Sequence, residues 1–299
     1  MAEKISLTTD VPMLKYGPKP MLDLVAKAGF DGIDYALCVY GHGVQPVRMM
    51  ELTQKEFEDH FMEIGGYAKA LGVKINSTHS LVYGYGPDNA VNEQRFLQAQ
   101  KDIEATALLG AKYCVIHSST NADWGLEANP ADLIAANQQM YADLTPTAEK
   151  FGVYLTLESF GSCGKGYDYF AHHQSMRDEF DAIKTQNKAF CLDTGHTHCA
   201  AGCGCLSVED FIRFFGSRIK TLHLHDNNGY SDQHAIPGYG TINWPAVFRA
   251  LNDIGYKGFY NFELELRPFG DSVDTAVLLL GKFLREFVQK QGVIRPTWK

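Results

Sequence analysis

The segment EKFGVYLTLES (Glu149–Ser159) contains the local event that decides the fold. A helix-forming stretch ends at Gly152, and an apolar run typical of a buried strand follows at once. The same event recurs in KAGFDGID (Lys27–Asp34), KALGVKIN (Lys69–Asn76) and ALLGAKYC (Ala107–Cys114). A helix that stops repeatedly at glycine, just before a buried strand, predicts that helices and strands alternate along the chain.

Eight short apolar runs of strand length are spread along the 299 residues. Between them, we expect helices over 53–71, 92–109, 131–150 and 244–254. Strict alternation indicates a parallel sheet covered by helices, and eight such units predict a single closed (β/α)8 barrel domain over residues 1–299. An open doubly wound sheet is the alternative, although no G-x-G-x-x-G or Walker loop follows any strand. The runs begin at Ile5, Gly32, Val73, Tyr113, Val153, Ala189, Ile219 and Phe259.

Composition and charge narrow the class of protein. The formal net charge is −8 and the chain holds only nine arginines, so we expect no nucleic-acid partner. No apolar run has the length needed to span a bilayer, and the first ten residues lack the hydrophobic centre of a signal peptide. We therefore expect a cytoplasmic protein with no membrane partner.

The seven cysteines do not predict a disulfide framework, because their number is odd and no export signal precedes them. Cys114 and Cys191 lie inside apolar runs and are interpreted as small core residues. Cys199, Cys203 and Cys205 have the spacing C-x3-C-x-C, which is not usual for structural zinc. A glycine-rich turn carrying incidental thiols is the favoured interpretation.

Six consecutive predicted strands, the third to the eighth, end in a potential metal ligand or acid–base group. In a (β/α)8 barrel the C-terminal strand ends meet at one mouth, where the chemistry occurs. A single histidine there would most simply be a hydrogen-bonded core residue, but six matching positions are hard to reach by chance. Carboxylates in apolar strands are costly unless paired, and a divalent cation would pair several at once. The six residues are His79, His117, Glu158, Asp193, His223 and Glu263.

Further candidate ligands lie in the segments that follow the sixth and seventh strands. His196 comes three residues after Asp193, in a predicted loop, and is expected to be a second ligand or a substrate contact. Asp232 and His234 form a D-x-H pair in the glycine-rich loop after the seventh strand. His225 alternates with His223, so we expect it to point elsewhere and to play a structural or supporting role.

These motifs resemble those of the sugar phosphate isomerase/epimerase family, the xylose isomerase-like TIM barrels that also include endonuclease IV. LESFG (Leu157–Gly161), LDTGH (Leu192–His196) and LHLHDN (Leu222–Asn227) are similar to the family's fifth-, sixth- and seventh-strand motifs. DQHAIPGYGTINW (Asp232–Trp244) looks like its D-x-H loop, and GYKGFYNFELE (Gly255–Glu265) like its last strand. The resemblance covers essentially the whole chain.

The ketose 3-epimerase branch implies one metal held by Glu158, Asp193, His223 and Glu263. Oxygen-rich ligation with one imidazole suits Mn²⁺, with Mg²⁺ and Co²⁺ as alternatives. The implied reaction is isomerisation or epimerisation of a carbohydrate through an enediolate, with Glu158 and Glu263 moving the proton and His196 orienting the substrate. The epimerases carry an arginine six residues after the seventh-strand histidine, whereas Gly229 stands here.

Three alternatives remain open. Endonuclease IV holds three zinc ions, and its ligand types all occur here, with His79, His117, His196, Asp232 and His234 available for further metals or for substrate. A keto-sugar lyase would use the same enolate chemistry. A catalytically inactive sugar-binding barrel is disfavoured because no ligand is lost. Relatives are often homo-oligomers, and aromatic side chains could stack on a sugar at the mouth: Tyr83, Tyr85, Trp124, Phe160, Tyr167 and Tyr239.

Overall fold

The computed structural model describes residues 3–41, 48–80, 84–125, 128–161 and 168–293. Eight parallel strands form the sheet, in the order β7-β6-β5-β4-β3-β2-β1-β8. Leu224 joins the two ends, because its N–H donates to Asn261 O (2.8 Å) and its carbonyl accepts from Glu263 N (3.2 Å). The predicted (β/α)8 barrel is therefore confirmed. The strands are β1 (Ile5–Thr8), β2 (Gly32–Ala36), β3 (Lys74–His79), β4 (Tyr113–Ile116), β5 (Tyr154–Glu158), β6 (Lys188–Asp193), β7 (Ile219–His223) and β8 (Tyr260–Phe262).

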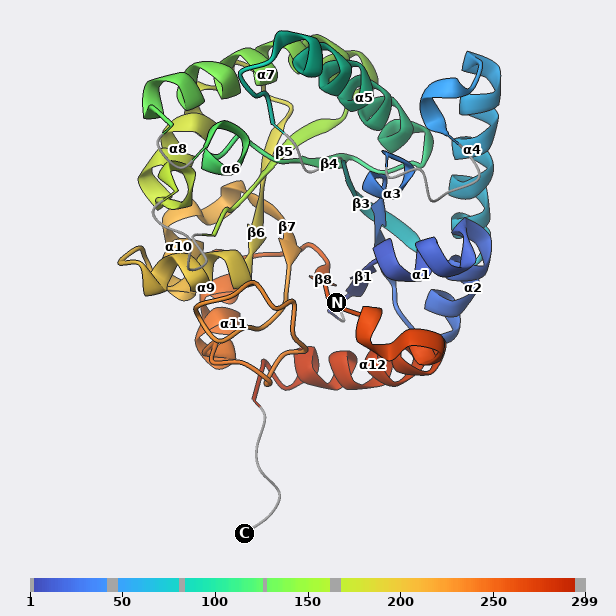
Figure 1. Cartoon of the computed structure of the whole chain (residues 1–299). Helices are drawn as coiled ribbons and strands as arrows, with labels where there is room; N and C mark the ends of the chain where they lie inside the picture. Colours follow the sequence, from blue (N-terminus) through green and yellow to red (C-terminus); the bar gives the residue numbers. More distant parts are fainter. Residues whose placement is uncertain (1–2, 42–47, 81–83, 126–127, 162–167, 294–299) are drawn as a thin grey trace.

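Helices surround the strands on the outside of the barrel (Figure 1). Eight of the described helices connect or follow strands as the main outer layer. The helices of this outer layer are α2 (Pro18–Lys27), α4 (Gln54–Ala70), α5 (Asn89–Leu108), α7 (Pro130–Phe151), α8 (His173–Ala182), α10 (Val208–Phe215), α11 (Trp244–Asp253) and α12 (Val273–Gln289). The others are α1 (Asp10–Tyr16), α3 (Cys38–Gly41), α6 (Asn121–Trp124), α9 (Thr194–Gly202), η1 (Met49–Glu51), η2 (Tyr169–Ala171), η3 (Gly216–Arg218) and η4 (Arg267–Ser272).

The four predicted helices are confirmed within three residues at each end, and local chemistry explains their limits. Thr53 caps α4 in a complete capping box with Glu56, and Asn129 caps α7 just before Pro130. Gly152 ends α7 in the left-handed region, with φ of +66°, which a side chain would disfavour. Each strand then begins within a few residues, as the repeated sequence event predicts.

The core lies between the barrel wall and the helices. Phe57 and Phe61 of α4, Tyr141 of α7 and Phe287 of α12 are buried in one hydrophobic cluster with the apolar strand residues. Among the described residues, no helix combines the length and apolar character needed to cross a bilayer.

Candidate metal centre

The six predicted strand-end residues gather at one end of the barrel. His79, Glu158, Asp193 and His223 are the last residues of β3, β5, β6 and β7. His117 and Glu263 come directly after β4 and β8. Because all eight strands run in parallel, their C-terminal ends open at the same mouth. The register of the sheet also sets Asp193 beside His223 and Glu158 beside Cys191.

The centre of the mouth is a group of three carboxylates and one imidazole. One potential ligand atom from each of Glu158, Asp193, His223 and Glu263 lies within 4.8 Å of the other three. Nδ1 of His223 lies 2.8 Å from Oε1 of Glu158 and 3.2 Å from Oε2 of Glu263. Ligand bonds of about 2.1 Å place opposite ligand atoms about 4.2 Å apart, so these four side chains fit around one divalent cation.

Two further histidines face the same glutamate. Nε2 of His117 lies 2.8 Å from Oε2 of Glu158, and Nε2 of His79 lies 3.4 Å from the same oxygen. Both rings are buried, and His117 meets the Phe160 ring edge-on at a centroid distance of 5.4 Å. His79, His117 and Glu158 therefore form a second group that could hold a cation.

A third group lies nearer to solvent. Oδ2 of Asp232 lies 3.2 Å from Nε2 of His196 and 3.0 Å from Nε2 of His234. Nδ1 of His196 also lies 3.0 Å from the Ser159 carbonyl oxygen, which leaves its Nε2 directed at Asp232. The D-x-H loop thus lies next to the central group, because Nδ1 of His234 is 3.9 Å from Oε2 of Glu263, and it shares a potential cation site with His196.

His196 is in a helix, so its prediction as a loop residue is wrong. Asp193 ends β6 and also caps α9, because its Oδ1 accepts a hydrogen bond of 2.7 Å from His196 N. One carboxylate therefore ends a strand, starts a helix and faces the metal group. Cys199 lies buried in α9, and among the described residues no cysteine belongs to a potential metal group.

Sequence reasoning missed Asp34. This fully buried carboxylate of β2 places Oδ2 at 3.1 Å from Nε2 of His223. A carboxylate behind a ligating imidazole fixes its tautomer and raises its basicity, so Asp34 would hold the Nδ1 lone pair of His223 toward the centre. The signal was present, because Asp34 interrupts the apolar run GIDYAL, but it lies mid-strand rather than at the strand end.

His225 lies close to the ligand ring and joins His234 and Glu263 in a further potential cation group, so its supporting role stays a prediction. Its Nε2 lies 3.0 Å from Asp193, and its ring stacks on His234 at a centroid distance of 3.9 Å. A Cβ added to Gly195 would lie 1.9 Å from Cε1 of His225. The glycine of the LDTGH motif therefore makes room for the imidazole that orients Asp193.

Neighbouring charges at the mouth strongly shift the pKa values of the acid–base groups. Burial alone would raise the pKa of Glu158, but His223 and His117 outweigh it and hold that pKa well below its ordinary value. Burial likewise opposes the shift of Glu263, yet His223 and His234 lower its pKa. Burial would lower the pKa of His79, but Glu158 and Glu263 raise it to about 9. The carboxylates are therefore ionised at neutral pH and attract cations.

The aromatic residues that were candidates for sugar stacking differ in whether they are available at the mouth. Phe160 stacks on His196 at 5.7 Å, and Tyr239 is 83% exposed, so both remain available at the mouth. Tyr85 is buried, and its carbonyl accepts a hydrogen bond from the Trp124 indole, so this pair packs a loop. Tyr83, Tyr167 and Cys163 lie outside the described residues.

The chain belongs to the xylose isomerase-like TIM barrel family, whose sequence model matches residues 22–285. A probable endonuclease 4 of Geobacillus kaustophilus is 28% identical over 58% of this chain and 55% of its own length. The D-psicose 3-epimerase of Enterocloster bolteae is 24% identical over 80% of this chain and 74% of its own. The chain spans about half the length of the first curated relatives it matches.

Solved structures agree on the fold. A D-tagatose 3-epimerase-like protein superposes with a TM-score of 0.73 at 21% identity, covering 97% of this chain and 100% of that one. The IOLI protein with a bound zinc atom gives a TM-score of 0.74 at 18% identity, again covering 97% of this chain and 100% of that one. At such identities the likeness concerns the fold alone.

Proposed function

We propose that this chain is a divalent-metal-dependent sugar isomerase or epimerase that moves a proton next to a substrate carbonyl through an enediolate. The observation that carries the proposal is the central group, in which Glu158 and Glu263 share potential metal-ligand geometry with Asp193 and His223. Two ionised glutamates at one mouth supply the two proton-transfer groups that such a reaction needs. The epimerase and isomerase relatives support the same class of activity.

The four central residues would hold the cation, and their oxygen-rich set favours Mn²⁺, with Mg²⁺ or Co²⁺ as alternatives. A bound cation would polarise the substrate carbonyl and the adjacent hydroxyl. The Glu263 side chain is 16% exposed and the Glu158 side chain 1%, so Glu263 is the more accessible of the two to an incoming substrate. Both carboxylates are ionised at neutral pH, because the neighbouring histidines outweigh burial and hold their pKa values low.

His196 would orient the substrate, because its ring is fixed between Ser159 O and Asp232 and stacks on Phe160.

Substrate contact after the seventh strand differs from that in the epimerases the sequence resembles. Gly229 has φ of +80°, which disfavours an arginine there, and a Cβ at this position would lie 3.5 Å from Nε2 of His198. We propose a small carbohydrate as substrate, with His198 rather than an arginine beside this position.

Solvent deuterium exchange tests the proposal directly. With a panel of ketoses in D₂O, the wild type should incorporate deuterium at the carbon next to the carbonyl. Glu158→Gln and Glu263→Gln should each abolish incorporation, whereas Glu149→Gln, an exposed glutamate on α7, should not. Retained exchange in both active-site variants would refute their assignment as the proton-transfer pair. Bond cleavage in place of epimerisation would point to the lyase alternative.

A second candidate function rests on the overlap of the metal groups. Every ligand type implied by endonuclease IV is present, and the structure brings His79, His117 and Glu158 together beside the trio of His196, Asp232 and His234. A multinuclear zinc phosphodiesterase is therefore the alternative, and nucleic acid would then be its substrate class.

Metal content per chain separates the two functions. Protein purified without added metal or chelator should contain about one ion per chain if only the central group is used. Two or three zinc ions would favour the phosphodiesterase. In that case Asp232→Ala combined with His234→Ala should lower the content, whereas unchanged content would make this pair a substrate contact.

A further inference from the structure

A cavity of about 490 Å³ lies at the opposite end of the barrel from the metal group. Its wall is built from strand beginnings: Lys74 opens β3, and Lys220 is the second residue of β7. His79 ends the same β3 strand, five residues after Lys74, which at about 3.3 Å per residue separates the two positions by roughly 16 Å. The cavity is thus distinct from the candidate active site.

The lining of this cavity has an unusual charge. Five lysines contribute to the wall, and none of its 15 lining residues is an aspartate or glutamate. No ion pair forms at any of the five among the described residues, although the chain as a whole carries a net charge of −8. Five cationic side chains around one hollow repel one another, and a multiply charged anion would relieve that repulsion. The lysines are Lys4, Lys74, Lys112, Lys220 and Lys257.

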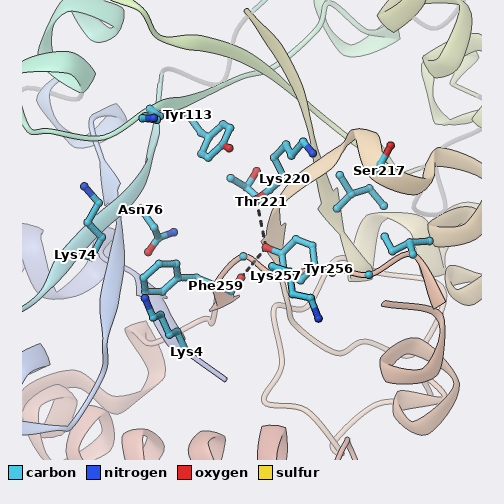
Figure 2. A pocket seen from close by; sticks show the side chains of 15 residues that line it. Lys4, Lys74, Asn76, Tyr113, Ser217, Lys220, Thr221, Tyr256, Lys257 and Phe259 are labelled. Carbon is cyan, nitrogen blue, oxygen red and sulfur yellow. Dashed lines mark hydrogen bonds between the residues drawn. The ribbon is translucent and has the colours of Figure 1, made fainter. Parts of the chain in front are cut away.

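The wall between the lysines offers flat surfaces and polar groups. Figure 2 shows Phe259, Tyr113 and Tyr256 around the hollow, with Lys4 and Lys74 on one side and Lys220 and Lys257 on the other. Tyr256 is held in place because its hydroxyl donates to Phe259 O at 2.9 Å. The Thr221 hydroxyl of the wall is buried and has no hydrogen-bond partner among the described residues.

We propose that this basal cavity binds a small, multiply charged phosphate compound. Its volume is in the range of ordinary small-molecule sites. Lysine ammonium groups are suited to phosphate oxygens, and the aromatic wall could stack a planar ring. A nucleoside diphosphate and an inorganic polyphosphate both carry the required negative charge. They differ in that only the nucleoside diphosphate has a planar ring that can stack on the aromatic wall. The concave shape and the small-molecule volume favour a small molecule over a nucleic-acid backbone.

Calorimetric titration of the full-length protein as purified tests this site, with ADP and inorganic pyrophosphate as probes. Wild type should bind at least one probe saturably, with one site per chain, and more weakly as salt rises from 50 to 150 mM because exposed charges are screened. Lys220→Gln combined with Lys257→Gln should weaken binding about tenfold or more. Tighter binding of ADP would identify a nucleotide, and equal binding would identify the phosphate alone.

The matched control is Lys27→Gln combined with Lys282→Gln, which removes the same charge from exposed positions on α2 and α12. Its affinity should stay within about twofold of wild type. Absence of saturable binding to wild type at millimolar probe would overturn the proposal. So would equal affinities of the two double variants, since the probe would then bind elsewhere, for example at the metal centre.

Discussion

Glu179 predicts a specific pH dependence of stability. Its carboxyl is buried on α8 and accepts a hydrogen bond of 2.6 Å from the Ser118 hydroxyl, which also lies 3.1 Å from the Tyr141 hydroxyl. Burial raises the pKa of Glu179 to about 8, against the weaker opposing effect of the Ser118 hydrogen bond. The folded protein therefore keeps a proton on Glu179 at pH values where the unfolded chain has released it.

The sign and size of the effect follow from linkage. Below the unfolded pKa of about 4.5 both states are protonated, and the contribution to stability is complete. As pH rises from there to about 8, the free energy of unfolding falls by up to about 1.4 kcal/mol per pH unit. Between pH 6 and 8 the loss is roughly 2 kcal/mol, after allowing for half-titration at the upper end. Glutamine keeps the shape without titrating, so Glu179→Gln should lack this loss.

Urea unfolding at pH 6, 7 and 8 measures the free energy of unfolding of wild type and of Glu179→Gln. The difference between the two values isolates Glu179, because titrations common to both proteins cancel. Wild type should lose about 2 kcal/mol relative to the variant over this range. Glu149→Gln is the matched control, because Glu149 accepts a hydroxyl hydrogen bond from Thr185 (2.8 Å) but is exposed, and its difference from wild type should stay constant. A flat or opposite slope for Glu179→Gln would refute the reasoning.

Three further predictions concern the metal centre. Asp34→Asn should weaken binding of Mn²⁺ about 10- to 100-fold by calorimetry, whereas Asp31→Asn, whose carboxylate faces Arg285, should not; equal affinities would exclude a supporting role for Asp34. Gly195→Ala should displace His225 from Asp193 and also lower metal affinity, while Gly66→Ala, with open space around its Cβ, should leave affinity unchanged; matching affinities would contradict the contact. Added metal at 100 times its dissociation constant should raise the free energy of unfolding by about 2.7 kcal/mol, and no rise in thermal midpoint would argue against a bound cation.

Much of the fold follows from repeated local signals. The glycine stops at Gly72, Gly110 and Gly152 all have positive φ, and the strands after them begin where the apolar runs predict. The six strand-end candidates come together because the C-terminal ends of parallel strands in a closed barrel all lie at the same end of the barrel.

The features that sequence reasoning missed depend on pairs of distant residues. Asp34 faces His223 across the barrel, 189 positions away in the chain, and its mid-strand position gives no sign of that partner. The polar stretch after Asp193 predicts a loop at His196, whereas the structure has a helix there whose N-cap is the Asp193 carboxylate itself. The basal lysines look like ordinary solvated charges until the closed barrel sets them around one cavity.

The outer trio decides between the two candidate functions, because protons and metal ions compete for the same atoms there. Burial alone would lower the pKa of His234, but Asp232 and Glu263 outweigh burial and raise that pKa to about 10. The His234 ring therefore carries a proton at neutral pH when no cation replaces the proton. Removing that proton at pH 7 costs on the order of 4 kcal/mol. Zinc, whose binding to dedicated protein sites supplies about 10–16 kcal/mol, can overcome that cost. Harder ions such as Mg²⁺ or Mn²⁺ gain less from imidazole, so with them the two histidines of the trio would stay protonated and donate hydrogen bonds to substrate hydroxyls. A single hard cation in the centre therefore favours a sugar enzyme, whereas zinc would convert the same residues into a multinuclear centre.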